Sequence, residues 1–224
     1  MNILYTFILE DKKQRNFSID IDDKTITLIK DENKELPKWC ELDFNKCSHC
    51  PFDNSQKHCP VAANLEQAVA FFSGIISYDK TCVIVKIGNR DIYCETSVQN
   101  GLKSLMGLLI ATSKCPHTDF FKPMARFHLP FADSDETLWR SASYFLLQEY
   151  LKRLNSNDKS LSLEPLKKKY RDIEILNTFM AARLSGASKK DSAVNALISL
   201  DIFAKRIGPD FEKRLASILE LYTY

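Results

Sequence analysis

The sequence is poor in glycine and proline, with 6 and 8 of its 224 residues, so it has little room for low-complexity linkers. It also lacks a strong charge of either sign. A formal net charge of +2 is too small to indicate nucleic acid or an anionic membrane as the partner. An unidentified protein or small molecule is the partner class that remains.

Long hydrophobic runs are missing as well. No apolar stretch approaches the length of a membrane-spanning helix. Residues 1–10 have neither a basic segment nor a small-residue cleavage site, so they are not predicted to be a signal peptide. These features predict a soluble protein with no membrane association, and we expect it in the cytoplasm.

Recognisable catalytic motifs are also absent. The chain has no glycine-rich phosphate loop, no G-x-S-x-G elbow and no HExxH helix. The sequence therefore names no reaction, and a non-enzymatic role is favoured over catalysis.

Cysteine, in contrast, is plentiful and locally clustered. Seven cysteines are an odd number, which fits reduced thiols in the cytoplasm better than a disulfide framework. Residues 47–51 read CSHCP, and Cys59 follows nine residues after Cys50. A Cys-x2-Cys pair lets two thiolates in one turn reach the same ion, as in zinc and iron–sulfur sites. Cys47, Cys50 and Cys59 are therefore predicted metal ligands.

A closed tetrahedral site needs a fourth ligand. The candidates are Cys115, Cys40, His49, His58 and His117. Cys115 is favoured because Cys50, Cys59 and Cys115 are each followed directly by proline, which stiffens the turn that holds a ligand. A ligand at Cys115 would also tie the loop to a distant part of the chain and close a long loop. Local supply by Cys40 is the second choice.

The expected metal is zinc, because four-thiolate sites are the common structural zinc arrangement. An iron–sulfur cluster is the alternative, since proline after a ligating cysteine is typical of ferredoxins, although the spacing here differs from theirs. In the first case the site is structural and the protein has a binding or regulatory role. In the second, the protein is a metal enzyme or redox sensor.

The segment 123–131 (PMARFHLPF) places Arg126 and His128 in an otherwise apolar stretch. If the segment is extended, both side chains point the same way. They are then candidates for binding a cofactor or anion beside the cysteines, with His128 available for acid–base work. The structural alternative pairs Arg126 with an acidic residue such as Glu136 and gives His128 a hydrogen bond beneath the metal loop.

The apolar patterns predict an α+β fold with a strand-rich half, 1–130, and a helical half, 131–224, packed as one unit. Residues 2–30 alternate as a small antiparallel meander of strands, including 25–28. Gly88-Asn89 joins strands 81–87 and 90–96 in a hairpin that pairs Val83 with Cys94, making Cys94 a core residue.

Helix boundaries are predicted from capping residues. Asn64 with Gln67 indicates a helix that begins after the cysteine loop, and Ser97 indicates one over 98–113. In the second half, Asp133 with Glu136 opens a helix, and Pro165 lies in the first turn of the next. A further helix begins near residues 188–191 and stops at Gly208, and the last one covers 209–221.

Several sequence blocks occur together in one order. They are 47–51 (CSHCP), 59–62 (CPVA), 99–102 (QNGL), 105–108 (LMGL), 115–116 (CP) and 123–131 (PMARFHLPF). With this order the chain resembles a family of bacterial conserved proteins of unknown function, from Trp39 onward. The resemblance implies four cysteine positions, at Cys47, Cys50, Cys59 and Cys115, with Cys40 outside the pattern. Lys114 departs from the pattern, which favours glycine there, and the resemblance implies no activity, cofactor or substrate.

Overall fold

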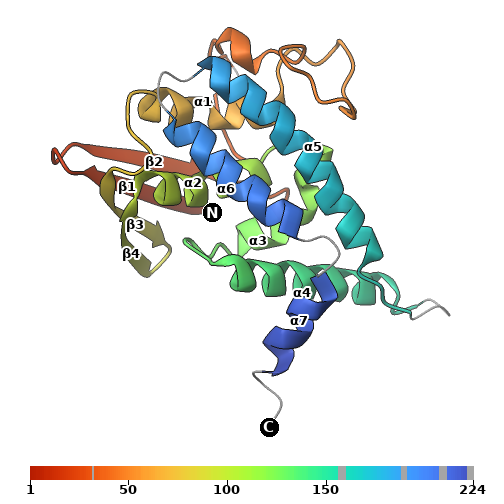
Figure 1. Ribbon diagram of the computed structural model, residues 1–224. Coiled ribbons are helices and arrows are strands. Elements are labelled where there is room, and N and C mark those ends of the chain that lie inside the picture. The colour runs from red at the N-terminus through yellow and green to blue at the C-terminus, as the bar shows by residue number, and fades with distance from the viewer. Residues whose placement is uncertain (32, 156–159, 188–190, 207–210, 221–224) are drawn as a thin grey trace.

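The computed structural model describes residues 1–31, 33–155, 160–187, 191–206 and 211–220. It is an α+β fold in which a four-stranded antiparallel sheet precedes a helical region, as predicted (Figure 1). The strands are β1 (Asn2–Leu9), β2 (Gln14–Asp20), β3 (Lys80–Ile87) and β4 (Arg90–Ser97), in the order β2-β1-β3-β4. The two hairpins thus join into one sheet through β1 and β3.

The β3–β4 hairpin has the predicted register. Val83 pairs with Cys94, and Lys86 pairs with Asp91. Gly88 has a φ of 57°, the left-handed conformation that a two-residue loop requires and that glycine adopts without strain. Cys94 is only half-buried, so its predicted place in the core is wrong. The reason is that β4 is an edge strand, covered less completely than β3.

The predicted N-terminal meander is correct for two strands and wrong for the third. Residues 25–28 form no strand, and a single bridge joins Ile21 to Leu28. Ile26 has a φ of 53°, which a β-branched residue in a strand does not adopt. The chain here turns around Asp22, whose side chain accepts hydrogen bonds from Lys24 and Thr25. It then enters the long connection to the first α-helix.

The helices begin close to the predicted caps, with one exception. They are α1 (Pro60–Phe72), α2 (Val98–Ala111), α3 (Lys122–Arg126), α4 (Ser134–Lys152), α5 (Glu164–Ala187), α6 (Ser192–Arg206) and α7 (Phe211–Glu220). Two short 3-10 helices, η1 (Lys38–Cys40) and η2 (Pro116–Phe121), complete the described elements. Asp133 and Glu136 form the predicted capping box of α4.

The exception is α1, which begins at Pro60 rather than after Asn64. Cys59 is its N-cap, and Pro60 provides the fixed φ that suits the first helical position. Asn64 lies inside the helix, where its buried amide donates to the Leu109 carbonyl of α2. The predicted starts at 188–190, the stop at Gly208 and residues 209–210 and 221 lie outside the described residues.

One face of the sheet packs on the helices. Ile3, Tyr5 and Phe7 of β1 are fully buried against α1 and α2. Gly101 allows α2 to approach the sheet, because a Cβ there would lie 2.8 Å from Val83 Cγ2 and 2.9 Å from Phe7 Cε1. In Figure 1 the sheet lies at left and α5 at right, with α2 and α6 between them, and α2–α6 and α5–α6 are packed pairs.

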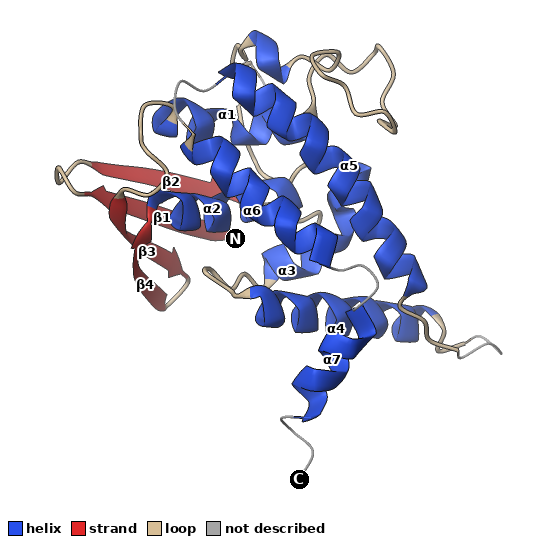
Figure 2. Cartoon of the chain, viewed as in Figure 1, coloured by secondary structure: helices blue, strands red, loops and turns tan. Residues whose placement is uncertain are grey.

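The buried residues fall into two clusters. The larger one joins the sheet to α1, α2, α6 and one end of α5. The smaller one contains Leu138, Phe145, Leu166, Tyr170 and Phe211, from α4, α5 and α7. Figure 2 shows α4 and α7 set apart from the sheet, and α5 contributes to both clusters.

Candidate metal centre

The cysteine loop connects β2 to α1 and has almost no regular structure. Its two ends are held together by backbone contacts, since Glu41 bridges His58 and the Cys59 N–H donates to the Cys40 carbonyl at 2.8 Å. Cys40 and Cys59 are thus neighbours, and both are buried. The backbone pairing fixes the base of the loop, while residues 47–53 extend beyond it.

Arg183 of α5 holds the same end of the loop from the helical side. Its guanidinium donates to the carbonyls of Trp39, Glu41 and Leu42 at 2.6 to 2.8 Å, and the side chain is 1% exposed. Hydrogen bonds from a charged donor are stronger than neutral ones, and they satisfy carbonyls that no strand or helix uses. A residue far along the chain therefore orders part of the cysteine loop.

Cys47 and Cys50 form the tight turn that the sequence predicts, with the Cys50 N–H donating to the Cys47 carbonyl at 3.1 Å. Cys59 and Cys115 occupy equivalent positions on two different elements. Cys59 is the N-cap of α1 and Cys115 is the N-cap of η2, and a proline follows each. Neither side chain caps its helix, so both sulfurs remain available to another partner.

Electrostatics place these four thiols near one another. Burial raises the pKa of Cys115 to about 12, and the charges of Cys59, Cys47 and Cys50 raise it further, while the His117 N–H lowers it. Burial also raises the pKa of Cys47 to about 11, with added contributions from Cys59 and Cys50. Without a positive charge among them these buried thiols stay neutral, and a bound cation would reverse that balance.

Cys40 belongs to a different electrostatic environment. Burial raises its pKa to about 12, and the next contributions come from Glu66 and Cys59. Two cations, Arg183 and Lys30, oppose this rise. Cys82 and Cys94 lie on the sheet, on β3 and β4.

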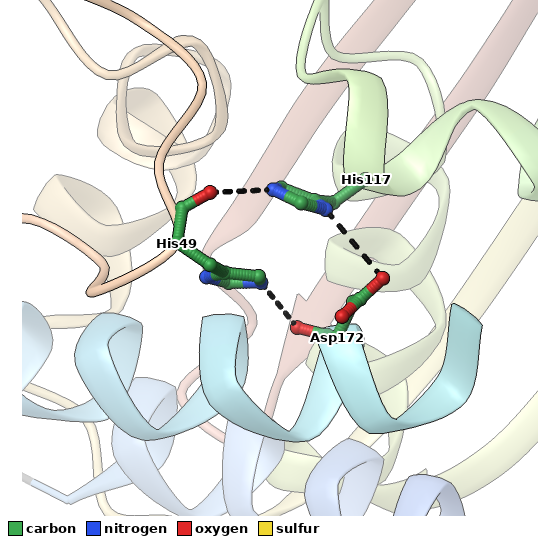
Figure 3. Close-up of side chains that lie close together, drawn as sticks. All are labelled: His49, His117 and Asp172. Carbon is green, nitrogen blue, oxygen red and sulfur yellow. Dashed lines mark hydrogen bonds and ion pairs between the residues drawn. The ribbon is translucent and has the colours of Figure 1, made fainter. Parts of the chain in front are cut away.

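Two histidines join the two cysteine turns to α5. Figure 3 shows the rings of His49 and His117 stacked, with their centroids 4.0 Å apart. His117 Nε2 lies 3.0 Å from the His49 carbonyl, and His49 Nε2 lies 3.0 Å from the Asp172 carbonyl. His117 Nδ1 is 3.9 Å from Asp172 Oδ2. The turn at residues 47–50 therefore contacts the turn after Cys115 directly.

This histidine pair was missed as a structural element. His49, His58 and His117 were considered as metal ligands, but both stacked rings direct Nε2 to a carbonyl oxygen. Asp172 gave no signal in the sequence, since it lies on the solvent side of a helical pattern. Among the described residues, His49, His117 and Asp172 have ligand atoms all within 4.8 Å of one another. This is a possible cation-binding geometry, but its two carbonyl contacts already use one nitrogen of each ring.

The four sulfurs are more widely spaced than a bound metal requires. Among the described residues, no three cysteine sulfurs lie all within 4.8 Å of one another. A tetrahedral site with Zn–S bonds of about 2.3 Å brings sulfurs to about 3.8 Å. The residue types, burial and proximity fit a thiophilic metal, and binding would require the sulfurs to close by about 1 Å.

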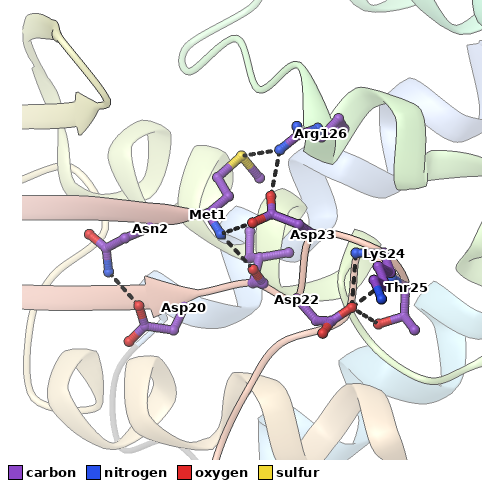
Figure 4. Close-up of polar contacts among 9 residues, drawn as sticks. Met1, Asn2, Asp20, Asp22, Asp23, Lys24, Thr25 and Arg126 are labelled. Carbon is purple, nitrogen blue, oxygen red and sulfur yellow. Dashed lines mark hydrogen bonds and ion pairs between the residues drawn. The ribbon is translucent and has the colours of Figure 1, made fainter.

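Arg126 and His128 lie on different partners. Arg126 is at the end of α3, so the expectation of an extended segment is wrong there. Its guanidinium pairs with Asp23 at 2.7 Å and contacts the Met1 sulfur, as Figure 4 shows, rather than pairing with Glu136. In the same view the Met1 amino group contacts Asp23.

His128 points to the sheet instead. Its Nε2 lies 2.6 Å from the hydroxyl of Tyr5, which also contacts Ser104 at 2.8 Å. Burial lowers the pKa of His128 to about 3, with a smaller effect from Arg140. The imidazole is therefore neutral at physiological pH, and its hydrogen bond is to β1 rather than to the metal loop.

Comparison with known proteins adds a family but no activity. No helix among the described residues is long and apolar enough to cross a membrane. No curated protein and no solved structure matches the chain. One family model matches residues 3–223, nearly the entire length. The chain therefore belongs to the family described as a domain of unknown function, DUF6901.

Proposed function

We propose that Cys47, Cys50, Cys59 and Cys115 bind a single metal ion, zinc, and that the protein is a non-enzymatic binding or regulatory protein. The observation that carries this proposal is the meeting of two cysteine turns. His117 Nε2 contacts the His49 carbonyl, and this joins the turn after Cys115 to the turn at 47–50. Four mutually close thiols result, with Cys59 and Cys115 buried.

The proposed role of the ion is structural. Four thiolates fill a tetrahedral coordination sphere, so no position remains for substrate. The ion would connect the loop before α1 to the end of α2, and the sulfurs would be held as thiolates by its charge. Thiolate ligands need a reducing compartment such as the cytoplasm, which is where we place the protein.

Elemental analysis of the full chain, purified without oxygen, tests the proposal. We expect about one zinc per chain in the wild type. Changing Cys59→Ser or Cys115→Ser should abolish metal binding and the cooperative unfolding transition, because metal binding and folding are coupled. Cys94→Ser is the matched control, since this half-buried thiol lies on the edge strand β4 and should leave metal content unchanged.

Cys40→Ser distinguishes the two choices for the fourth ligand. If Cys115 is the ligand, Cys40→Ser retains the metal, although a buried thiol is replaced. Retention by Cys115→Ser with loss in Cys40→Ser would move the fourth ligand to Cys40. A wild-type chain that folds without stoichiometric metal would reject the structural site altogether.

An iron–sulfur cluster is the second candidate, and the prolines after Cys50, Cys59 and Cys115 are the observation in its favour. A brown protein whose visible absorbance bleaches with dithionite would support it. The version of this candidate that places Arg126 and His128 beside the cluster has less support, because these residues contact Asp23 and Tyr5.

A further inference from the structure

A cavity of about 330 Å³ lies between the two hydrophobic clusters. Its walls come from α2, the segment from α3 to the start of α4, α5 and α6. Apolar side chains such as Leu108, Phe131 and Ile173 make up most of the lining. At roughly 30 Å³ per water-sized group, this space suits a molecule of about ten non-hydrogen atoms.

Asn177 provides the first sign that the cavity is meant to be filled. The residue lines the cavity from α5 and is 3% exposed, and its Nδ2 has no hydrogen-bond partner within the described part of the chain. A buried donor without an acceptor is destabilising, and native proteins keep few of them. A ligand oxygen in the cavity would supply the missing acceptor.

Gly107 provides the second sign. Glycine inside a helix is unfavourable, and at Gly101 the close approach of the sheet explains it. At Gly107, a Cβ would meet only Leu200 Cδ2, at an ordinary contact distance of 3.9 Å. Backbone packing does not demand a glycine there. Because Gly107 lines the cavity, the missing side chain leaves that space open.

The charged groups around the cavity indicate the sign of the ligand. Lys103 and Arg140 both line it, and neither forms an ion pair with a described residue. Arg140 donates instead to the carbonyls of Met124 and Phe127. Asp133 is the acidic residue of the lining, but its carboxylate already accepts from the backbone N–H groups of Asp135 and Glu136. His128 is neutral, so the unbalanced charge is positive.

We propose that this cavity binds a medium-chain carboxylic acid, with the hydrocarbon chain against the apolar walls and the carboxylate accepting from Asn177 and attracted by Lys103 and Arg140. The class follows from three properties together: an apolar volume of limited size, an unpartnered amide donor and two cations without acidic partners. This site is separate from the metal centre and does not depend on it.

Octanoate is the probe, titrated calorimetrically into the full-length, metal-loaded protein at neutral pH. We expect octanoate to bind at least about tenfold more tightly than octylamine, whose charge has the opposite sign. Gly107→Leu should abolish binding by filling the space, and Gly107→Ala should weaken it while favouring the helix. Thr178→Ala, at an exposed position of α5, is the control and should bind as the wild type does.

Asn177→Leu separates the amide from the volume. The replacement has a similar size but no donor, so octanoate affinity should fall at least about tenfold. The ligand-free variant should unfold at the same or a higher temperature, because the unpartnered amide is gone. The proposal is overturned if octanoate does not bind at millimolar concentration, if octylamine binds as well, or if Gly107→Leu and Asn177→Leu bind as the wild type does.

Discussion

Two polar junctions connect the helical part of the chain to its N-terminal part, and they are built differently. At the first, Arg183 of α5 lies among three carbonyls of the cysteine loop and is almost fully buried. At the second, Arg126 and His128 contact the first strand and its neighbouring turn. Arg126 is 44% exposed there, and its partner Asp23 is 61% exposed.

The contrast shows that burial and backbone satisfaction, rather than residue type, decide what an arginine contributes. Carbonyls of an irregular loop have no other donors, so the loss of Arg183 would leave several of them unpaired. The Arg126–Asp23 pair is solvated on both sides, and water replaces it easily. The cysteine loop therefore has two organisers, Arg183 at its base and the proposed metal at its tip.

Replacing Arg183 with methionine is expected to have the largest effect at either junction. Removal of the guanidinium leaves the carbonyls of Trp39, Glu41 and Leu42 without it, and we expect a loss of at least about 3 kcal/mol in the free energy of unfolding. Arg183→Lys keeps the charge but lacks the planar set of donors, so its loss should be intermediate.

Urea unfolding of the metal-loaded protein measures these differences. A loss below about 1 kcal/mol for Arg183→Met would mean that the metal orders the whole loop by itself, and that the base needs no separate organiser. The contrast between the two junctions would then disappear.

Local patterns predicted the elements well, because alternation and capping depend on near neighbours. The β3–β4 register and the α4 capping box came directly from such patterns. The start of α1 was wrong because Asn64 looks like a cap, but Cys59-Pro60 is the better helix start and its amide is used across α2. A proline after a polar N-cap was the signal that could have corrected it.

Long-range polar contacts could not be predicted in the same way. Arg183 and Asn177 both interrupt the apolar stripe of α5, between Ile173 and Leu184, and a polar residue at such a position signals a buried partner. The sequence gives that signal without naming the partner. The pairing of His117 with the His49 carbonyl and the cavity beside Gly107 depend on how distant helices pack, which periodicity does not encode.

The pH dependence at His128 is the second prediction, with a moderate effect. Its folded pKa of about 3 lies below the ordinary value of 6.5, so the unfolded chain binds the proton first as pH falls. Stability is therefore full above pH 6.5 and declines as the pH falls from there toward 3. Since the ring is half-buried, solvent reduces the effect, and we expect about 1 kcal/mol lost by pH 5.

His128→Gln isolates this contribution, since glutamine can still contact the Tyr5 hydroxyl but does not titrate. Unfolding free energies of both proteins at pH 7.5 and pH 5 give the difference, from which the acid sensitivity of the cysteines cancels. Equal pH dependence in the two proteins would show that the imidazole is not desolvated in the folded state, and that the second junction has no buried half.

The smallest effect is expected for Arg126→Ala. The ion pair with Asp23 is exposed, and Asp23 keeps its contact with the Met1 amino group, which is also the main reason that the pKa of Asp23 is lowered. The melting temperature should change by about 1 °C or less, and the change should shrink further at high salt because exposed pairs are screened. Differential scanning calorimetry at low and high salt measures it. A large, salt-independent loss would place Arg126 in the same class as Arg183, and exposure would no longer explain why the two junctions differ.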